Sequence, residues 1–432
     1  MPVRRRDFPQ VKNLKDADAF LAHLDTLGIT LPFADPPDVD SLAAPIEVAG
    51  RTCGNRFCIL PMEGWDGTPE GRPTDLVRRR WGRFGESGAG LVWGGEAFAV
   101  RPDGRANPHQ LCLGPSSADD LAELHALLDP QQVTGLQLTH SGRWSVEPRP
   151  PRHDALLDGR RSGALLTSAE LDDLVGDYVT AAGLARDAGF DFVDVKACHG
   201  YLLHELLSGD GELAERTATM RAITERIREA GIRVGVRLSI FDLPPHLPGP
   251  DGVGAPEASE PWGFNDPIAL IDALGIDLLC TTAGSPYYCP HAQRPAWTPP
   301  SDGYAPPEDP LVGVARLLWA AAAVSAARPD VTVVATGFSY LQEWLPHVAS
   351  AMVRDGGTAL VGIGRMALSY PDLPADVLAG REIDRKRLCR TFSDCTTAPR
   401  NGLVSGCYPL DPMYKEHPDR PLLVQAKKRA RA

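Results

Sequence analysis

Short runs of apolar residues alternate with longer stretches of helical periodicity along most of the chain. Eight runs of apolar and β-branched residues predict strands, and seven patterns between them, with apolar positions three or four residues apart, predict helices. The predicted strands are residues 57–61, 90–95, 135–140, 192–196, 234–239, 277–281, 331–336 and 358–362. The predicted helices are residues 74–84, 118–128, 169–187, 214–230, 267–274, 311–327 and 341–354. This alternation is typical of βα units that build a parallel sheet.

Eight strands with helices between them favour an α/β fold, a closed (β/α)8 TIM barrel, over an open sheet. No Gly-x-Gly-x-x-Gly motif follows the first strand, which weakens the alternative of a dinucleotide-binding open sheet. Thr167 and Glu170 form a capping-box pattern at the start of the third helix. We predict three parts: an N-terminal extension at 1–50 that packs on the barrel and has one amphipathic helix, the barrel at 51–381, and a tail at 382–432.

Two long segments rich in proline and glycine, residues 241–261 and 284–310, follow the fifth and sixth predicted strands. In a barrel enzyme the loops after the strands overhang the active face. We therefore predict that both segments form walls of a substrate site. The alternative is that they are solvated insertions.

The charge and composition of the chain limit the classes of molecule that we expect it to bind. The 44 Lys and Arg against 56 Asp and Glu give a net charge of −12, which disfavours nucleic-acid binding, because a polyanion must be neutralised. We expect a small-molecule substrate. No run of about 20 apolar residues occurs, so we expect no membrane span. Nine scattered cysteines, and no apolar stretch after the arginines at 4–6, predict reduced thiols in a cytoplasmic protein. Whether the chain forms a homo-oligomer is left open.

Polar side chains gather at the predicted strand ends, where barrel enzymes carry their chemistry. Gln137 is on the third strand, Lys196, His199 and Tyr201 end the fourth, and Arg237 is on the fifth.

Glycines mark the exits of the last two predicted strands, at Gly337–Phe338 and Gly364–Arg365. Backbone amides at glycines and an arginine fork both suit an anion, and barrels commonly bind phosphate after strands seven and eight. The alternative is ordinary turn glycines and a surface arginine.

The order of these motifs resembles that of the old yellow enzyme-like NADH:flavin oxidoreductases, over roughly residues 50–380. Five strand-end motifs carry the resemblance: Asn55, Arg56, Pro61 and Met62; Gln137, Leu138, His140, Gly142 and Arg143; His199, Gly200, Tyr201 and Leu202; Val236, Arg237, Leu238 and Ser239; Gly364 and Arg365.

The resemblance implies FMN as the cofactor, with NADH or NADPH as a transient hydride donor. Gln137 would pair with the flavin pyrimidine and Arg237 would stand near its N1 and C2 carbonyl, where the reduced ring gathers negative charge. The remaining implied contacts are Pro61, Met62, Glu63 and Ala97 at the ring, and Gly337, Phe338, Gly364 and Arg365 at the phosphate.

For the substrate, the resemblance implies that His199 polarises a carbonyl and that Tyr201 protonates the α-carbon of an activated C=C bond. Further substrate contacts are expected from the loop after the sixth strand and from the first motif: Tyr287, Tyr288, His291 and Trp65.

Two residues depart from the family pattern. Lys196 stands where most relatives present a second histidine or similar donor, and Glu63 where a threonine or cysteine often tunes the flavin. Lys196 has three open roles: binding a carboxylate or phenolate, stabilising an enolate, or pairing with Asp194 or Asp66. Two alternatives to alkene reduction therefore stay open, namely oxidation of an amine or alcohol and a non-catalytic flavin-binding barrel.

Three cysteines of the tail, Cys389, Cys395 and Cys407, fall where the dienoyl-CoA reductase and amine dehydrogenase branch of the family binds an iron–sulfur cluster. The preceding Cys-x-x-Cys-x-x-x-Cys spacing is absent, and a cluster normally needs four thiolates. We therefore expect no iron–sulfur cluster and no other metal.

Overall fold

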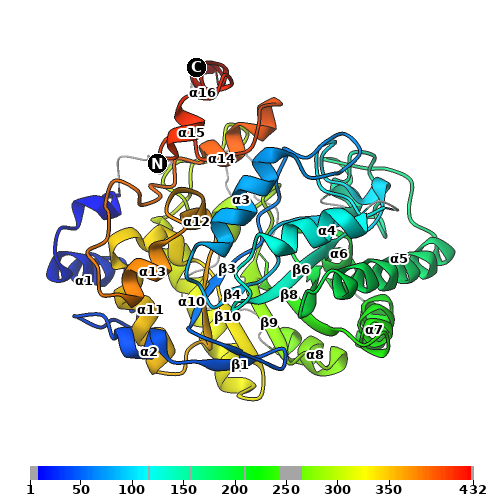
Figure 1. Ribbon diagram of the computed structural model, residues 1–432, viewed down its shortest axis with the longest axis horizontal. Helices are drawn as coiled ribbons and strands as arrows, with labels where there is room; N and C mark the ends of the chain where they lie inside the picture. Colours follow the sequence, from blue (N-terminus) through cyan, green and yellow to red (C-terminus); the bar gives the residue numbers. More distant parts are fainter. Residues whose placement is uncertain (1–7, 115–116, 155–156, 209–210, 243–264, 430–432) are drawn as a thin grey trace.

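The computed structural model describes residues 8–114, 117–154, 157–208, 211–242 and 265–429. Eight parallel strands close into a barrel, because β3 pairs with both β4 and β11 and the chain of neighbours returns to β4 through β6 (Figure 1). All eight predicted strands are confirmed. Their bounds are β3 (Phe57–Ile59), β4 (Leu91–Val92), β6 (Val133–Thr139), β7 (Phe192–Ala197), β8 (Arg233–Phe241), β9 (Leu278–Ala283), β10 (Thr332–Ala335) and β11 (Leu360–Ile363).

The second barrel strand is interrupted. It stops after β4 and resumes as β5 (Ala97–Ala99), and both pieces pair with β6. Gly95 in the gap has a φ of 55°, and a Cβ atom there would lie 2.3 Å from the ring of Trp81. Only glycine fits this bend, which divides the single strand predicted for 90–95.

Helices surround the barrel as predicted, and Thr167 and Glu170 form the expected capping box (Figure 1). The last predicted helix begins four residues late, at Leu345, because Gln342 has non-helical angles and the preceding turn is the 3-10 helix η4 (Phe338–Trp344). The helix bounds are α3 (Asp75–Gly85), α4 (Ser117–Ala126), α5 (Ser168–Asp187), α7 (Leu213–Glu229), α8 (Asn265–Leu274), α10 (Pro310–Ala327) and α11 (Leu345–Arg354).

α10 has 18 residues and is long and apolar enough to cross a membrane by length and composition alone. However, 56% of it is buried, and it packs against β9 and β10. Arg316 on this helix is paired with Glu308. Burial of this kind is typical of a core helix of the barrel wall.

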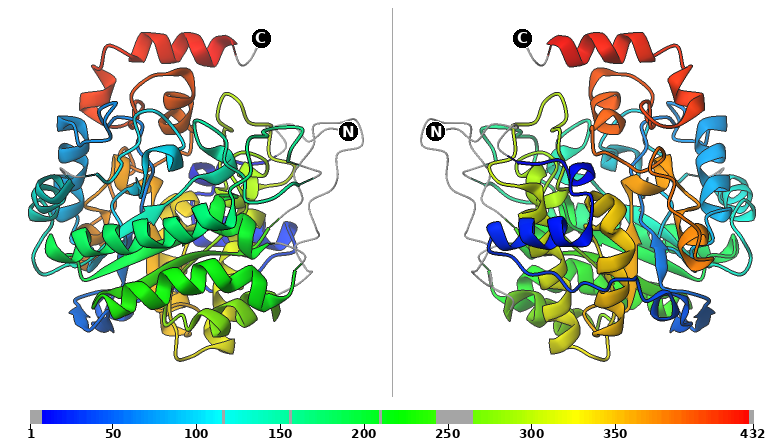
Figure 2. Two further views of the ribbon diagram at one scale, coloured as in Figure 1. Left: turned by 90° about the vertical axis from the view of Figure 1, so that its right-hand side faces the viewer. Right: turned by 90° about the vertical axis from the view of Figure 1, so that its left-hand side faces the viewer.

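The two chain ends cover different parts of the barrel (Figure 2). In the N-terminal extension, Phe20 on α1 (Ala17–Thr26) stacks on Trp344 at a centroid distance of 5.2 Å. The hairpin of β1 (Ile46–Val48) and β2 (Arg51–Cys53) lies at the opposite end of the molecule from the tail (Figure 1). The tail contains α14 (Asp394–Thr397), α15 (Pro412–Lys415) and α16 (Arg420–Arg429).

Candidate active site

A cavity of about 260 Å³ opens at the carboxyl ends of the barrel strands. It brings together residues that follow β3, β7, β9, β10 and β11 with side chains from inside β6 and β8. Thirteen of the predicted site residues line it: Pro61, Met62, Glu63, Trp65, Gln137, Lys196, His199, Tyr201, Arg237, Tyr287, Gly337, Gly364 and Arg365.

Four predicted site residues are buried and are not part of the cavity lining. Ala97 lies within β5, opposite Gln137 in the strand register, and Phe338 is a core residue. The Tyr288 hydroxyl donates to Asp242 at 2.5 Å, and His291 contacts the Tyr304 hydroxyl through Nδ1 at 2.6 Å.

The loop segments predicted as walls have different outcomes. Pro286, Gln293, Arg294 and Pro295 in the segment 284–310 line the cavity. Most of the other predicted wall, residues 243–261, lies outside the described residues.

Sequence reasoning missed a large part of the lining. The spacing of three arginines on α3 places them along one side of the helix, which the sequence could have predicted. No local pattern in the tail indicates that it lines the cavity. The missed residues with polar or sulfur-containing side chains are Arg79, Arg80, Arg83, Gln293, Arg294, Thr336, Ser339, Cys395, Thr396, Arg400, Ser405, Cys407 and Tyr414.

Two arginines meet near the exit of β11: Arg365 follows that strand, and Arg294 comes from the segment after β9. The Arg365 Nη2 atom donates to the carbonyl of Pro295 at 2.7 Å, and Arg294 donates to the Thr396 hydroxyl. Among the described residues, Arg365 Nη1 and Arg294 Nη2 are buried without a hydrogen-bond partner. Burial and the charge of Arg365 lower the pKa of Arg294 to about 10. Two adjacent cations with unused donors are a receptor for a dianion such as phosphate.

Gln137 has a fixed orientation. Its Nε2 atom donates to Asp194 Oδ2 at 2.5 Å, so its amide oxygen is left as the acceptor for a ligand. Asp194 is fully buried, and burial raises the pKa of its carboxyl to about 6 against the effect of the hydrogen bond from Gln137. Close by, Arg237 donates from Nη1 to the Pro61 carbonyl at 3.3 Å, while its Nε has no partner among the described residues.

His199 is held at the carboxyl end of β7 in a left-handed conformation, with a φ of 67°. Its Nε2 atom lies 3.2 Å from the Thr282 hydroxyl and 3.3 Å from Gln293 Nε2. Burial, then the charges of Arg237 and Lys196, hold the pKa of His199 well below its ordinary value. The imidazole is therefore neutral at neutral pH and can donate one hydrogen bond.

The two departures from the family pattern contact each other. Lys196 Nζ lies 3.6 Å from Glu63 Oε2 and 3.8 Å from the centre of the Tyr201 ring. The Tyr201 hydroxyl donates to the same Glu63 oxygen at 2.7 Å. Asp66 instead pairs with Arg80. Ion pairing was one of the roles left open for Lys196. The structure shows such a pair, but the partner is Glu63 and not Asp194 or Asp66.

Burial and the neighbouring Glu63 carboxylate raise the pKa of Tyr201 well above its ordinary value. Burial lowers the pKa of Lys196, and Glu63 opposes that shift. The phenol is therefore fully protonated at neutral pH and can act as a proton donor.

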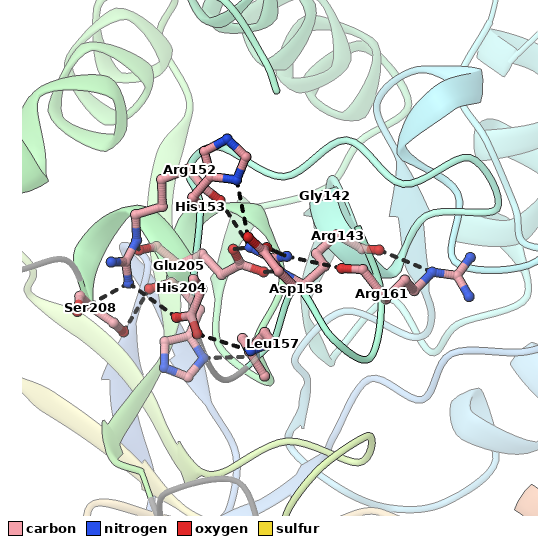
Figure 3. Close-up of polar contacts among 12 residues, drawn as sticks. Gly142, Arg143, Arg152, His153, Leu157, Asp158, Arg161, His204, Glu205 and Ser208 are labelled. Carbon is pink, nitrogen blue, oxygen red and sulfur yellow. Dashed lines mark hydrogen bonds and ion pairs between the residues drawn. The ribbon is translucent and has the colours of Figure 1, made fainter. Parts of the chain in front are cut away.

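A buried arginine fixes the start of the helix that follows Tyr201, α6 (Leu202–Leu207) (Figure 3). Arg143 donates from Nε to Glu205 on this helix at 2.9 Å and from Nη1 to Asp158 at 2.5 Å. The same Nη1 donates to the Arg161 carbonyl at 2.9 Å. The loop after β6 and the helix after β7 are thereby joined, which positions Tyr201.

The tail is tied down as a wall of the cavity. Asp411, whose side chain is fully buried, pairs with Arg79 at 2.9 Å and Arg83 at 2.5 Å on α3. The Ser405 hydroxyl accepts from the Trp65 amide at 2.8 Å. Within the described residues, no group of three or more His, Cys, Asp or Glu side chains is placed to hold a metal ion.

Part of the chain matches a known family of sequences. Residues 41–246 match the NADH:flavin oxidoreductase / NADH oxidase family. The NADPH dehydrogenase of Geobacillus thermodenitrificans is 30% identical over 179 residues, which are 39% of this chain and 51% of that protein. The NADPH dehydrogenase of Listeria monocytogenes is 30% identical over 170 residues, 38% of this chain and 48% of that protein. The similarity thus spans about half the length of these relatives.

Solved structures share the fold. A 2-naphthoyl-CoA reductase complex superposes with a TM-score of 0.68 at 19% identity, covering 87% of this chain and 57% of that one. Histamine dehydrogenase from Rhizobium sp. 4-9 gives a TM-score of 0.66 at 20% identity, covering 88% of this chain and 53% of that one. The old yellow enzyme homologue of Zymomonas mobilis gives a TM-score of 0.55 at 20% identity, covering 81% of this chain and 97% of that one. At these identities the likeness establishes the barrel fold.

Proposed function

We propose that this chain, whose residues 41–246 match the NADH:flavin oxidoreductase / NADH oxidase family, is an FMN-dependent oxidoreductase. It would use NADPH or NADH to reduce an activated C=C bond, such as that of an α,β-unsaturated carbonyl compound. One observation carries the proposal. A single cavity joins a pair of unsatisfied buried arginines at one end to a phenol and a neutral imidazole at the other.

The residues at the cationic end fit FMN. Arg294 and Arg365 would hold its phosphate, with the glycine exits at Gly337 and Gly364 leaving room for backbone approach. Gln137 would offer its amide oxygen to a ring N–H, and the unpaired Nε of Arg237 would meet the negative charge of the reduced ring. Bound FMN would supply hydride transfer from the nicotinamide to the substrate.

The residues at the other end would act on the substrate. His199, kept neutral, would donate a hydrogen bond to the substrate carbonyl and stabilise the charge that develops there. Tyr201 would turn its hydroxyl from Glu63 to the α-carbon and give up its proton. The names of the sequence relatives make NADPH the first hydride donor to test.

A second candidate is oxidation of an amine or alcohol. The Glu63 carboxylate already accepts a hydrogen bond from Tyr201, as a base would when the phenol takes a proton from a substrate. Histamine dehydrogenase is among the proteins that share the fold. A cytoplasmic location and the absence of nucleic-acid and membrane partners stay predictions from the sequence.

Anaerobic stopped-flow spectroscopy of the flavin-loaded protein tests the proposal. We expect NADPH or NADH to bleach the flavin absorbance and 2-cyclohexen-1-one to restore it. Bleaching by an amine or alcohol alone would support the second candidate, and a bound flavin inert to all of these compounds would support a non-catalytic barrel. A protein that takes up no FMN would contradict all three.

A further inference from the structure

Three side chains of the substrate end share one oxygen atom. Glu63 Oε2 accepts the Tyr201 hydroxyl at 2.7 Å and lies 3.6 Å from Lys196 Nζ. The ammonium also sits over the Tyr201 ring, 3.8 Å from its centre. Glu63 is thus within hydrogen-bond distance of the phenol and within ion-pair distance of the ammonium, and it connects Lys196 to the Tyr201 hydroxyl.

Tyr201 has little access to water. It is 3% exposed, and its hydroxyl contacts Glu63 and, at 3.2 Å, the hydroxyl of Tyr287. The Glu63 side chain is 15% exposed, against 5% for Lys196. After Tyr201 has given its proton to a substrate, its new proton must therefore come through a neighbouring side chain, and Glu63 is the more open of the charged pair.

We propose that Glu63 and Lys196 form a proton relay that recharges Tyr201 after each turnover. This inference rests on the proposed reduction of a C=C bond. When Tyr201 protonates the α-carbon, its O–H bond breaks and a C–H bond forms. An ammonium N–H bond of Lys196 then breaks as Glu63 takes the proton, and Glu63 passes it on to the phenolate, forming O–H. Neutral Lys196 regains a proton from water by way of Glu63.

The surroundings of Lys196 and Tyr201 favour transfer of a proton from the ammonium towards the phenolate. Burial makes Lys196 a stronger acid, since it lowers the pKa of the ammonium, and Arg237 adds to that effect, while Glu63, Cys198 and Asp194 oppose it. Burial, Glu63 and Tyr287 raise the pKa of Tyr201, so its phenolate takes up a proton readily. Glu63 and Lys196 act through Tyr201, so they are positioning residues in the proton path.

Single-turnover and steady-state rates with an enone separate the relay from other roles. In Glu63→Gln and Lys196→Met we expect the first turnover to stay within about threefold of the parent rate, followed by steady-state turnover at least about tenfold slower, which gives a burst of one product per site. Tyr201→Phe should slow the first turnover itself. Glu63→Asp should restore part of the steady-state rate.

Controls come from within the chain. Glu123→Gln removes a carboxylate that pairs with Arg78 on the surface and should keep both parent rates. Tyr287→Phe removes the other partner of the Tyr201 hydroxyl from the cavity lining, so any loss should fall on both rates alike, without a burst. A burst in Tyr287→Phe, or an equal loss of both rates in Glu63→Gln, would overturn the relay.

Titration of tyrosinate absorbance in the cofactor-free protein gives a readout independent of turnover. After subtraction of the Tyr201→Phe signal, Tyr201 should ionise at lower pH in Glu63→Gln and at higher pH in Lys196→Met than in the parent. Coinciding curves for the parent and Glu63→Gln would overturn the coupling. The parent enzyme could reduce no enone while these curves still separate as expected. In that case the proposed reaction would be wrong, but the electrostatic coupling of Glu63, Lys196 and Tyr201 would be supported.

Discussion

The two ends of the cavity balance charge in opposite ways. Among the described residues, Arg294 and Arg365 have no carboxylate within salt-bridge distance, and each keeps one unused donor. Lys196 at the substrate end is paired with Glu63 inside the protein. The arginine pair is therefore completed only by an anionic ligand, whereas the charge of Lys196 is already balanced within the protein.

The largest expected effect concerns Asp194, the buried carboxyl that accepts a hydrogen bond from Gln137. The pKa of Asp194 is raised from 3.8 to about 6. Between these values the folded protein holds a proton that the unfolded chain has lost, so stability falls as pH rises from about 4 to about 6. The whole change corresponds to about 3 kcal/mol.

Asp194→Asn should remove this pH dependence. Urea unfolding of the parent and the variant at several pH values measures it, and Asp191→Asn, which removes the partly exposed partner of Arg51, is a matched control. Parallel stability curves for Asp194→Asn and the parent would show that Asp194 ionises in the folded state as it does in water.

The second effect tests the cationic end. Arg365→Ala should weaken FMN binding by about 2 kcal/mol, roughly 30-fold, because a charge-assisted hydrogen bond to phosphate is lost. Quenching of flavin fluorescence on binding gives the dissociation constant. Arg354→Ala, which removes an exposed arginine paired with Asp355, should leave that constant unchanged. Equal affinities for Arg365→Ala and the parent would place the phosphate elsewhere.

Features that depend on neighbouring residues could be predicted from the sequence. All eight barrel strands were found because a strand buried on both faces is largely a continuous apolar run, as in Leu360–Ile363 of β11. The polar residues that end these strands converge for the same reason, since parallel strands present their carboxyl ends together. Most of the predicted site residues therefore line one cavity.

Features that depend on distant contacts could not be predicted. The tail forms part of the lining because Asp411 pairs with Arg79, 332 positions earlier in the chain, and no periodicity reports such a pair. The partner of Lys196 was missed in the same way, because Glu63 lies on another strand end. The break in the second barrel strand depends on the Trp81 ring beside Gly95, which is also a tertiary contact.

A third and smaller effect concerns the Lys196–Glu63 ion pair. Glu63→Gln leaves the charge of Lys196 uncompensated, so an enone that carries a carboxylate should bind roughly tenfold more tightly than to the parent, about 1.4 kcal/mol. A neutral enone of similar size should bind the two proteins alike. Dissociation constants of the charged and the neutral enone for both proteins measure the effect. If the charged enone gains nothing, the charge of Lys196 does not reach the substrate.

The smallest effect concerns Tyr287, which contacts the same phenol but carries no charge. Tyr287→Phe removes the 3.2 Å contact between the two hydroxyls and keeps the ring stacked on Trp144 at 4.2 Å. The free energy of unfolding should therefore fall by only about 1 kcal/mol. Tyr408→Phe in the tail, which loses a hydrogen bond to the Val404 carbonyl, is the matched control. Thermal unfolding and steady-state turnover measure both variants. A tenfold fall in turnover for Tyr287→Phe would mean that an uncharged side chain controls the phenol, and the internal ion pair would no longer distinguish the two ends of the cavity.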